Sequence, residues 1–192
     1  MKFLLGLVLG FLIIPLGVFI YVRSGNAPVA TADPPMPFEK SLTSKALHAR
    51  IDRQMPNRDV SGMSVSELET GAMTYQMNCS FCHGLPQHPS SVAKGMFPTP
   101  PQLFDPKEMV TDDPPGETYW KIKNGIRLTG MPSVRDTLSE KDTWQVAALL
   151  ARADKLPPSV LDVLKPLPAQ LAAKPAESAP APKTKTMPEK KK

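Results

Sequence analysis

The sequence predicts an all-α fold with long proline-rich loops and no large β-sheet. The chain of 192 residues contains 23 prolines, and only 6% of its residues are aromatic. Proline removes hydrogen-bond donors from a sheet, and strands favour aromatic and β-branched side chains. Between residues 64 and 156, apolar side chains instead recur at helical spacing behind helix-capping residues. The length allows one modest domain with extensions.

The N-terminal residues 1–24 predict a transmembrane anchor. No charged residue occurs between Phe3 and Val22, and a helix of that length spans roughly 30 Å, the thickness of the bilayer core. A cleaved signal peptide is the alternative, because Ala30-Thr31-Ala32 resembles a small-residue cleavage site. The apolar run is longer than a usual signal segment and ends well before that site. We therefore expect an uncleaved anchor.

Residues 25–63 predict a linker that contains one peripheral helix. The linker begins with a stiff proline-rich stretch, and helical spacing appears weakly from Phe38 to Gln54. We expect this helix to lie against the domain. Four apolar residues share one of its faces: Phe38, Leu42, Ala46 and Ala49.

The C-terminal residues 157–192 predict a solvated tail. Pro, Ala and Lys dominate this stretch, which offers too few large apolar side chains to offset the entropy lost on ordering. The whole positive excess of the chain lies from Lys155 onward, so residues 1–154 are neutral. A nucleic-acid-binding domain would carry its basic patch on the folded body, so this class is excluded. Docking of the tail on an acidic partner or lipid surface is the alternative.

The first helix of the domain at 64–156 is predicted to begin near Ser64. Two overlapping capping boxes occur there, Ser64 with Glu67 and Ser66 with Glu69. The residues that follow at helical spacing form one stripe: Leu68, Gly71, Ala72, Tyr75 and Cys79.

Two further helices are predicted beyond a proline-rich loop. One spans about 116–124 and ends at Gly125 as its C-cap. The last begins near Ser139, which Asp142 completes as a cap, and runs to about residue 154. The residues expected to be buried on it are Trp144, Val146, Ala147, Ala148, Leu149, Leu150 and Ala151.

The chemistry of the chain is concentrated in the pentapeptide Cys79-Ser80-Phe81-Cys82-His83. Two cysteines three apart, followed at once by histidine, are typical of a covalent haem c attachment site. One helical turn presents both thiols to the vinyl groups of a haem edge and directs His83 toward iron. A thioredoxin-like pair would need a βαβ context, and a zinc site would need further ligands at metal spacing. We expect one covalently bound haem c.

The ordered motifs between residues 65 and 155 resemble class I cytochrome c, and most closely the monohaem domains of bacterial respiratory chains. The motif residues are Gly71, Tyr75, Cys79, Cys82, His83 and Gly84, then Trp120, Ile122, Asn124, Gly125 and Ile126, then Thr129-Gly130-Met131-Pro132, then Trp144. The resemblance implies that Gly71 and Tyr75 lie where the first helix crosses the last. It also implies that glycine there admits an aromatic such as Trp144.

The sixth iron ligand is predicted to be Met131. Gly130 removes a side chain where the backbone must approach the ring, and Pro132 biases Met131 toward an extended conformation. In the family this position precedes the last helix. Met96 is the alternative, followed by the lone histidines His48 and His88. The iron-bound His83 should donate its other N–H to a carbonyl, which the stretch 86–101 could supply. Tyr119, Trp120 and Asn124 are candidates for haem-propionate contacts.

The sequence therefore predicts a membrane-anchored monohaem c-type cytochrome that transfers single electrons between unidentified redox partners of a respiratory chain. We expect no enzymatic activity of its own and a haem domain on the periplasmic side of the cytoplasmic membrane. A permanent haem subunit of a dehydrogenase or terminal oxidase complex is the alternative. A haem enzyme or gas sensor with an open sixth position is the third possibility.

Overall fold

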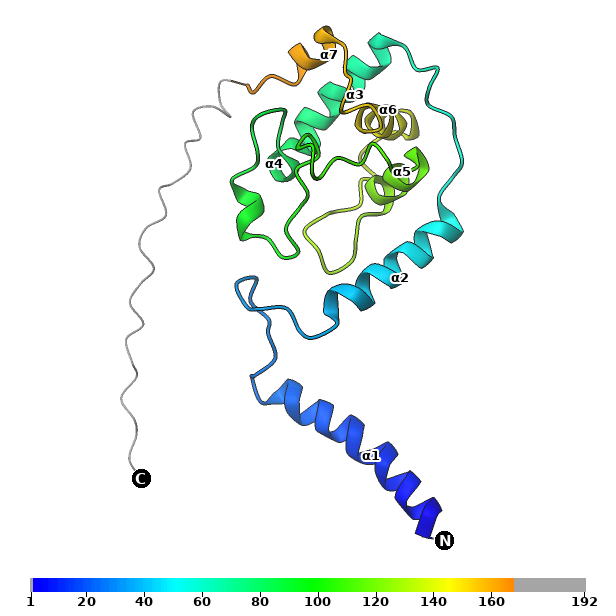
Figure 1. Cartoon of the computed structure of the whole chain (residues 1–192), viewed down its shortest axis with the longest axis vertical. Coiled ribbons are helices and arrows are strands. Elements are labelled where there is room, and N and C mark those ends of the chain that lie inside the picture. The colour runs from blue at the N-terminus through cyan, green and yellow to red at the C-terminus, as the bar shows by residue number, and fades with distance from the viewer. Residues whose placement is uncertain (1, 168–192) are drawn as a thin grey trace, which may run out of the picture.

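The computed structural model describes residues 2–167, and the side chains of residues 2–5 and 8 are outside the description (Figure 1). The described residues form helices and no strand. The α-helices are α1 (Lys2–Arg23), α2 (Glu39–Gln54), α3 (Val65–Asn78), α4 (Ser80–His83), α5 (Pro115–Asn124), α6 (Glu140–Leu150) and α7 (Pro158–Val163), and one 3-10 helix, η1, spans Val92–Gly95. The all-helical prediction is thus confirmed for these residues.

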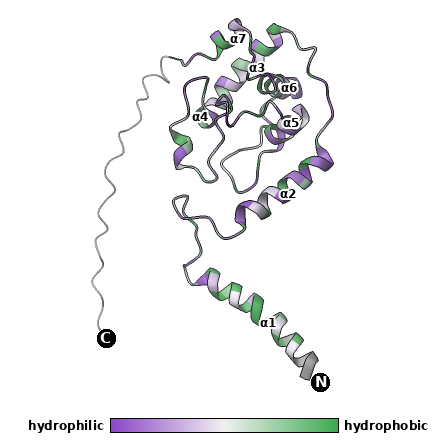
Figure 2. Ribbon diagram, in the orientation of Figure 1, coloured by the Kyte–Doolittle hydropathy of each residue, from purple (hydrophilic) through white to green (hydrophobic). Residues whose placement is uncertain are grey.

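Helix α1 extends away from the rest of the chain (Figure 1) and is coloured largely as hydrophobic in Figure 2. Its described large apolar side chains are exposed, with Phe11 at 73% and Ile14 at 71%. Within the described residues, no helix meets both the length and the hydropathy criteria of a membrane span. The transmembrane anchor at 1–24 stays a prediction.

The domain is organised by the crossing of α3 and α6. Helix α3 begins with the capping box of Ser64 and Glu67, whose side chain and backbone groups bond reciprocally. At the crossing, a Cβ atom added to Gly71 would lie 2.5 Å from the carbonyl oxygen of Gln145. The predicted crossing at Gly71 is confirmed. The neighbour that glycine admits is the α6 backbone and not the Trp144 ring.

We expect Gly71→Ala to destabilise the domain by about 1–3 kcal/mol, the usual cost of forcing an extra methyl group into a packed interface. The added carbon would meet backbone atoms of α6, which cannot move aside as the end of a side chain can. Chemical denaturation followed by circular dichroism measures the change. Gly95→Ala is the matched control, because nothing lies within 4 Å of its added Cβ. Equal stability of both variants would contradict the close crossing.

Helix α5 packs on α6 through two aromatic rings. Tyr119 and Trp144 stack with centroids 4.1 Å apart and an interplanar angle of 16°. The helix ends as predicted at Gly125, whose φ of 65° lies in the left-handed region that glycine tolerates. A Cβ there would also collide with the backbone of residues 131–133, so Gly125 lets the following loop fold back onto the helix end. The predicted start of α6 is confirmed, since the Ser139 hydroxyl accepts from the Asp142 N–H.

Helix α2 lies against the domain, as predicted, and its contact is with α5. The face that makes this contact is not the face that the apolar spacing predicted. Ile51 is fully buried and Leu47 is half-buried, whereas Phe38 and Leu42 are 85% and 71% exposed. Spacing groups Leu42, Ala46 and Ala49 on one face, but Phe38 lies outside the helix as its N-cap, with a left-handed φ of 64°. The domain covers the face that carries Ile51.

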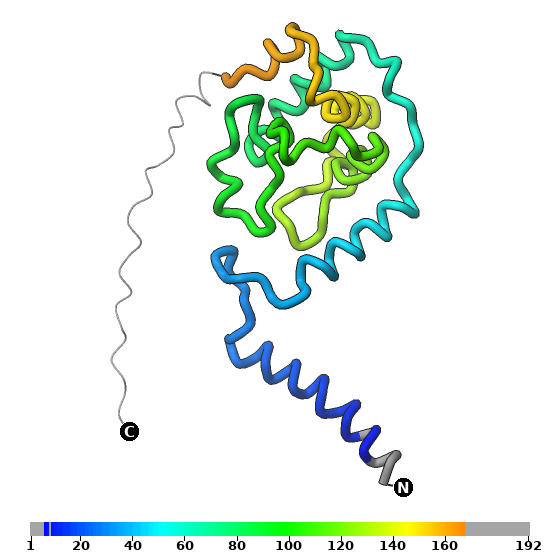
Figure 3. The backbone as a smooth tube through the Cα atoms, viewed as in Figure 1, coloured from blue at the N-terminus to red at the C-terminus, as the bar shows by residue number. Residues whose placement is uncertain are grey.

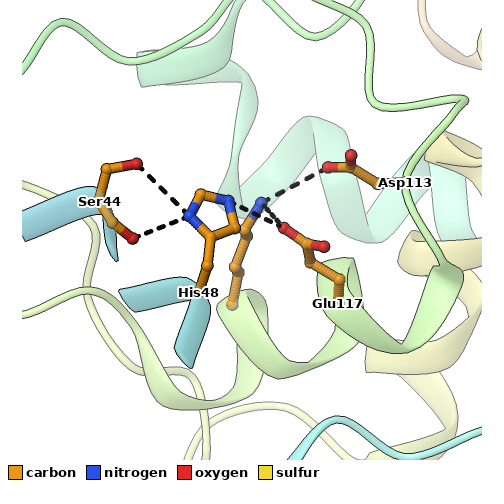
Figure 4. Close-up of polar contacts among 5 residues, drawn as sticks. Ser44, His48, Asp113 and Glu117 are labelled. Atoms are coloured by element: carbon orange, nitrogen blue, oxygen red, sulfur yellow. Dashed lines mark hydrogen bonds and ion pairs between the residues drawn. The ribbon is translucent and has the colours of Figure 1, made fainter. Parts of the chain in front are cut away.

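Polar contacts complete the junction between α2 and α5. The His48 Nδ1–H donates to the Ser44 carbonyl oxygen at 2.8 Å, and Nε2 lies 3.8 Å from the Glu117 carboxylate (Figure 4). Lys121 pairs with the same carboxylate at 2.6 Å and with Asp113 at 3.5 Å. Glu117 is thus held between groups from two helices.

The prediction of a solvated tail at residues 157–192 is wrong for the first residues of this stretch. Residues 158–163 form α7, which packs on α3 and buries Val160 completely and Leu164 to 1% exposure. Pro158 at the first helical position suits a helix start, and Val160 and Leu164 share one face at i, i+4 spacing. Residues 168–192 lie outside the described part of the chain.

Candidate functional site

The Cys79–His83 segment forms a tight helical turn at the end of α3. Helix α3 stops at Asn78 and α4 starts at Ser80, and the His83 N–H donates to the Cys79 carbonyl at 2.9 Å. Both cysteines are half-buried, and Cys79 packs against the buried cluster of the domain. The turn thus fixes the two thiols and the imidazole on one short piece of backbone.

The burial of Cys79 argues against a redox-active thiol pair. Burial, with a smaller contribution from Cys82, raises the pKa of the Cys79 thiol to about 12. Reactive cysteines in C-x-x-C oxidoreductases have a lowered pKa, because the thiolate is the nucleophile. Cys79 therefore lacks the lowered pKa of a redox-active thiol, which disfavours the thioredoxin-like alternative.

The imidazole of His83 is oriented by a backbone carbonyl. Its Nδ1 lies 2.8 Å from the Pro101 carbonyl oxygen, and a carbonyl only accepts, so Nδ1 carries the proton. This tautomer leaves the lone pair of Nε2 for a metal. Burial lowers the pKa of His83, against a smaller opposing effect of the Pro101 bond, which favours the neutral, ligating form. The structure thus selects Pro101 from the predicted stretch 86–101.

Gln102 is a site residue that the sequence analysis missed. Its Nε2 donates to the Cys82 carbonyl at 3.2 Å and to the Pro100 carbonyl at 3.1 Å, and its Oε1 accepts from the Ser90 N–H at 2.6 Å. These bonds tie the loop that carries the Pro101 carbonyl to the Cys-His turn. Residue spacing does not identify Gln102. The one signal in the sequence is that it follows two prolines, which constrain the backbone of the loop.

Gly84 closes the turn after His83. Its φ is 70°, and a Cβ there would lie 2.6 Å from Gln102 Oε1 and 3.0 Å from the His88 carbonyl oxygen. The Gly84 carbonyl accepts from the hydroxyl of Tyr75 at 2.8 Å. Burial raises the pKa of Tyr75 well above its ordinary value, so the hydroxyl remains a donor at physiological pH. Tyr75 also meets Phe104 edge-on, with centroids 5.2 Å apart.

We expect Tyr75→Phe to lower the stability of the domain by about 1–3 kcal/mol, because it leaves the buried Gly84 carbonyl without its donor. Thermal or denaturant unfolding measures the loss. Tyr21→Phe is the matched control: its hydroxyl donates to a backbone carbonyl at 3.4 Å on an exposed part of α1. A loss of stability in the control as large as that of Tyr75→Phe would contradict the role of burial.

Met131 lies in the loop after α5 and packs against the buried cluster that Cys79 also contacts. Its N–H donates to Thr129 Oγ1 at 3.1 Å, and its carbonyl accepts from the Ile126 N–H at 3.2 Å. The loop is therefore fixed on both sides of Met131. These contacts position the residue, and its role as an iron ligand stays a prediction.

Met96, the alternative ligand, lies next to the Met131 loop. Its Cε occupies the space beside Gly130, where a Cβ would collide with it. The loop after α4 and the loop after α5 thus adjoin at this point (Figure 3). Gly130 leaves room for the Met96 side chain, whereas the sequence predicted that this glycine lets the backbone approach the cofactor.

The other candidate residues have partners elsewhere. His48 belongs to the junction of α2 with α5, and His88 is exposed in the turn that follows the motif. The propionate candidates Tyr119, Trp120 and Asn124 line a cleft of about 850 Å³ that also includes Lys123 and Arg135. None of the four predicted haem-binding residues lines that cleft.

A comparison with protein families identifies the domain. Residues 66–150 match the family model described as cytochrome c oxidase, cbb3-type, subunit III. Among curated proteins, none matches the chain. The matched residues include the whole Cys-His turn, the Pro101 carbonyl, the Met131 loop and both crossing helices. Together with the oriented imidazole, the match supports a c-type cytochrome domain at residues 66–150, which implies haem c as its cofactor.

Proposed function

We propose that the chain is a membrane-anchored monohaem c-type cytochrome that carries single electrons between redox proteins of a respiratory chain. The observation that carries the proposal is the hydrogen bond from His83 Nδ1 to the Pro101 carbonyl, which presents Nε2 as a ligand next to two cysteines at haem c spacing. The match of residues 66–150 to a cytochrome family supports it.

The residues present fit a covalently bound haem. Cys79 and Cys82 would hold it by thioethers, and His83 Nε2 and the Met131 sulfur would bind the iron. Haem supplies reversible one-electron chemistry, and a thioether opposite histidine favours the reduced iron. The protein holds the imidazole by Pro101 and the methionine loop by Thr129. If His83 and Met131 both bound the iron, no iron position would remain for a substrate, which supports a carrier rather than an enzyme.

A second candidate is a permanent haem subunit of an oxidoreductase complex. The observation that favours it is the family description, which names a subunit of a cbb3-type cytochrome c oxidase. Carrier and subunit need the same domain, so the decisive measurement is association. Extraction in mild detergent followed by affinity purification should yield the chain alone if it is a mobile carrier. Stoichiometric recovery with other redox subunits would favour the subunit.

The proposed location is the cytoplasmic membrane, with α1 as a single anchor and the haem domain on the periplasmic side. The uncharged run from Phe3 to Val22 and the exposed apolar side chains of α1 support this anchor. The side follows from the resemblance, because cytochromes of this kind acquire their haem beyond the cytoplasmic membrane.

Spectroscopy of the purified full chain tests the proposal. We expect one haem per chain by pyridine haemochrome assay, a reversible one-electron titration, and no change in the reduced spectrum when CO is added. Rapid CO binding by the unsubstituted protein would contradict the closed sixth position. The open-site haem protein would then replace the carrier.

A further inference from the structure

Helix α2 presents an apolar face that the domain does not cover. We call Leu42, Ala46 and Ala49 of the helix, together with Phe38 at its N-cap, the α2 outer face; all four are exposed. The opposite side of the helix packs on the domain through Leu47 and Ile51. Packing on the domain therefore does not explain why this strip of the exposed side of α2 is apolar.

Basic side chains border the α2 outer face. At 100° per residue, Lys45 lies along one edge, Arg50 along the other, and Arg53 at the C-terminal end of the face. The same geometry places Asp52 on the edge of Lys45 and Glu39 on the edge of Arg50, so basic residues outnumber acidic ones by three to two. All three are exposed, and none forms an ion pair within residues 2–167. Long cationic side chains can place their apolar stems along an apolar surface while the charge reaches the interface. An apolar face with a cationic border is complementary to the surface of an anionic bilayer.

The α2 outer face is fixed relative to the cytochrome domain. Ile51 is fully buried, the Trp120 indole donates to Gln54 at 3.3 Å, and the Pro56 carbonyl contacts Gly116 of α5. After the helix, the Arg152 guanidinium bonds the carbonyl oxygens of Val60, Ser61 and Met63. A surface that binds α2 would therefore hold the domain in one orientation.

The connection to α1 keeps α2 near the membrane surface. Only residues 24–38 separate the two helices, which reach at most about 50 Å when fully extended. The actual path is shorter, because Asp33 Oδ2 accepts from the N–H groups of Val29 and Ala30 and turns the chain. In Figure 1, α2 lies on the side of the domain that faces α1, and α7 lies on the other side.

We propose that the α2 outer face lies on an anionic phospholipid surface and thereby orients the haem domain on the membrane. The inference rests on the proposed function only in that α1 brings the chain to the bilayer. The occupant is the lipid surface, because the face combines exposed apolar side chains with unpaired cations and adjoins the anchor. Lys45, Arg50 and Arg53 meet the lipid phosphates, and Phe38 and Leu42 enter the interface.

Nitroxide labels on the full-length chain test this placement. The label is attached to Leu42→Cys on the α2 outer face, to Ser159→Cys on α7 as the control, and to Leu12→Cys as the probe of α1. The unsubstituted chain is the labelling blank for Cys79 and Cys82. Each protein is placed in detergent, in phosphatidylcholine vesicles and in vesicles that also contain phosphatidylglycerol. Collision of the label with oxygen and with a water-soluble nickel chelate is then measured by electron paramagnetic resonance.

We expect the oxygen-to-nickel accessibility ratio at position 42 to rise several-fold in the anionic vesicles and to stay unchanged at position 159. Lys45→Gln should lower the ratio of surface-bound to free α2 by roughly fivefold. Lys141→Gln, which removes the same charge from an exposed position near the start of α6, should leave it unchanged.

The other outcomes contradict the placement of α2 on lipid or the membrane anchor. A water-accessible label at position 42 beside a lipid-accessible label at position 12 overturns the α2 placement and leaves the anchor intact. A water-accessible label at position 12 overturns the anchor itself. Equal protection of position 42 in detergent and in both kinds of vesicle shows a protein occupant, such as a second copy of the chain, and also overturns the inference.

Discussion

Cys79→Ala combined with Cys82→Ala abolishes the haem stain of the denatured chain. Thioether bonds survive denaturation, so the unsubstituted protein keeps its stain on a denaturing gel and its colour through acid–acetone extraction. The double variant has no covalent link and loses both. Each single variant keeps one thioether and part of the stain. The expected change is from full signal to background, the largest effect that any substitution in this chain should have.

Met73→Ala is the control for this experiment, since Met73 is an exposed residue one helical turn and a half before Cys79. It should keep the full stain. Extraction of haem from the unsubstituted protein would show that the cofactor is not held covalently. The assignment of the Cys79–His83 motif would then be wrong, although the helical domain would remain.

Met131→Ala should remove the weak absorption band near the red edge of the oxidised spectrum that marks an iron–thioether bond. The same change should lower the reduction potential markedly and open the iron to CO, because the thioether favours the reduced state and fills the sixth position. Optical spectra, a redox titration and CO difference spectra measure the three effects.

Met96→Ala is the matched control for Met131→Ala. The structure gives Met96 a packing role, since its Cε fills the space beside Gly130. Its removal should reduce stability modestly and leave the band in place. Loss of the band in Met96→Ala with its retention in Met131→Ala would reverse the two assignments and leave the carrier function standing. Retention of the band in both variants would exclude both methionines as ligands.

Three helix ends of the domain could be predicted because capping is a local property. The predicted end of the last helix near residue 154 was wrong, since α6 ends at Leu150. Ser64, Gly125 and Ser139 each fix a terminus through neighbours within a few residues, and the structure confirms all three. Helix α7 was missed for the opposite reason. The composition of residues 157–192, rich in Pro, Ala and Lys, predicted no helix there. Val160 and Leu164 stabilise α7 only because they are buried against α3, which is distant in the sequence.

The orientation of α2 and the details of the site depend on contacts that spacing does not encode. Spacing shows that Phe38 and Leu42 share a face, but only the position of α5 shows that Ile51 is the residue covered. The motif at Cys79–His83 was visible because its chemistry requires fixed intervals. The contribution of Gln102 was not visible in the sequence, since Gln102 bonds backbone groups of Cys82, Ser90 and Pro100, which are separated along the chain.

The acceptor that orients His83 is a main-chain oxygen, and this determines how the domain tolerates mutation. Every amino acid has a carbonyl group, so no substitution at position 101 deletes the acceptor while the loop keeps its path. The Met131 side has no such protection, because a single codon change removes the sulfur. Substitutions at position 101 that keep the path of the loop should therefore preserve the orientation of the His83 imidazole.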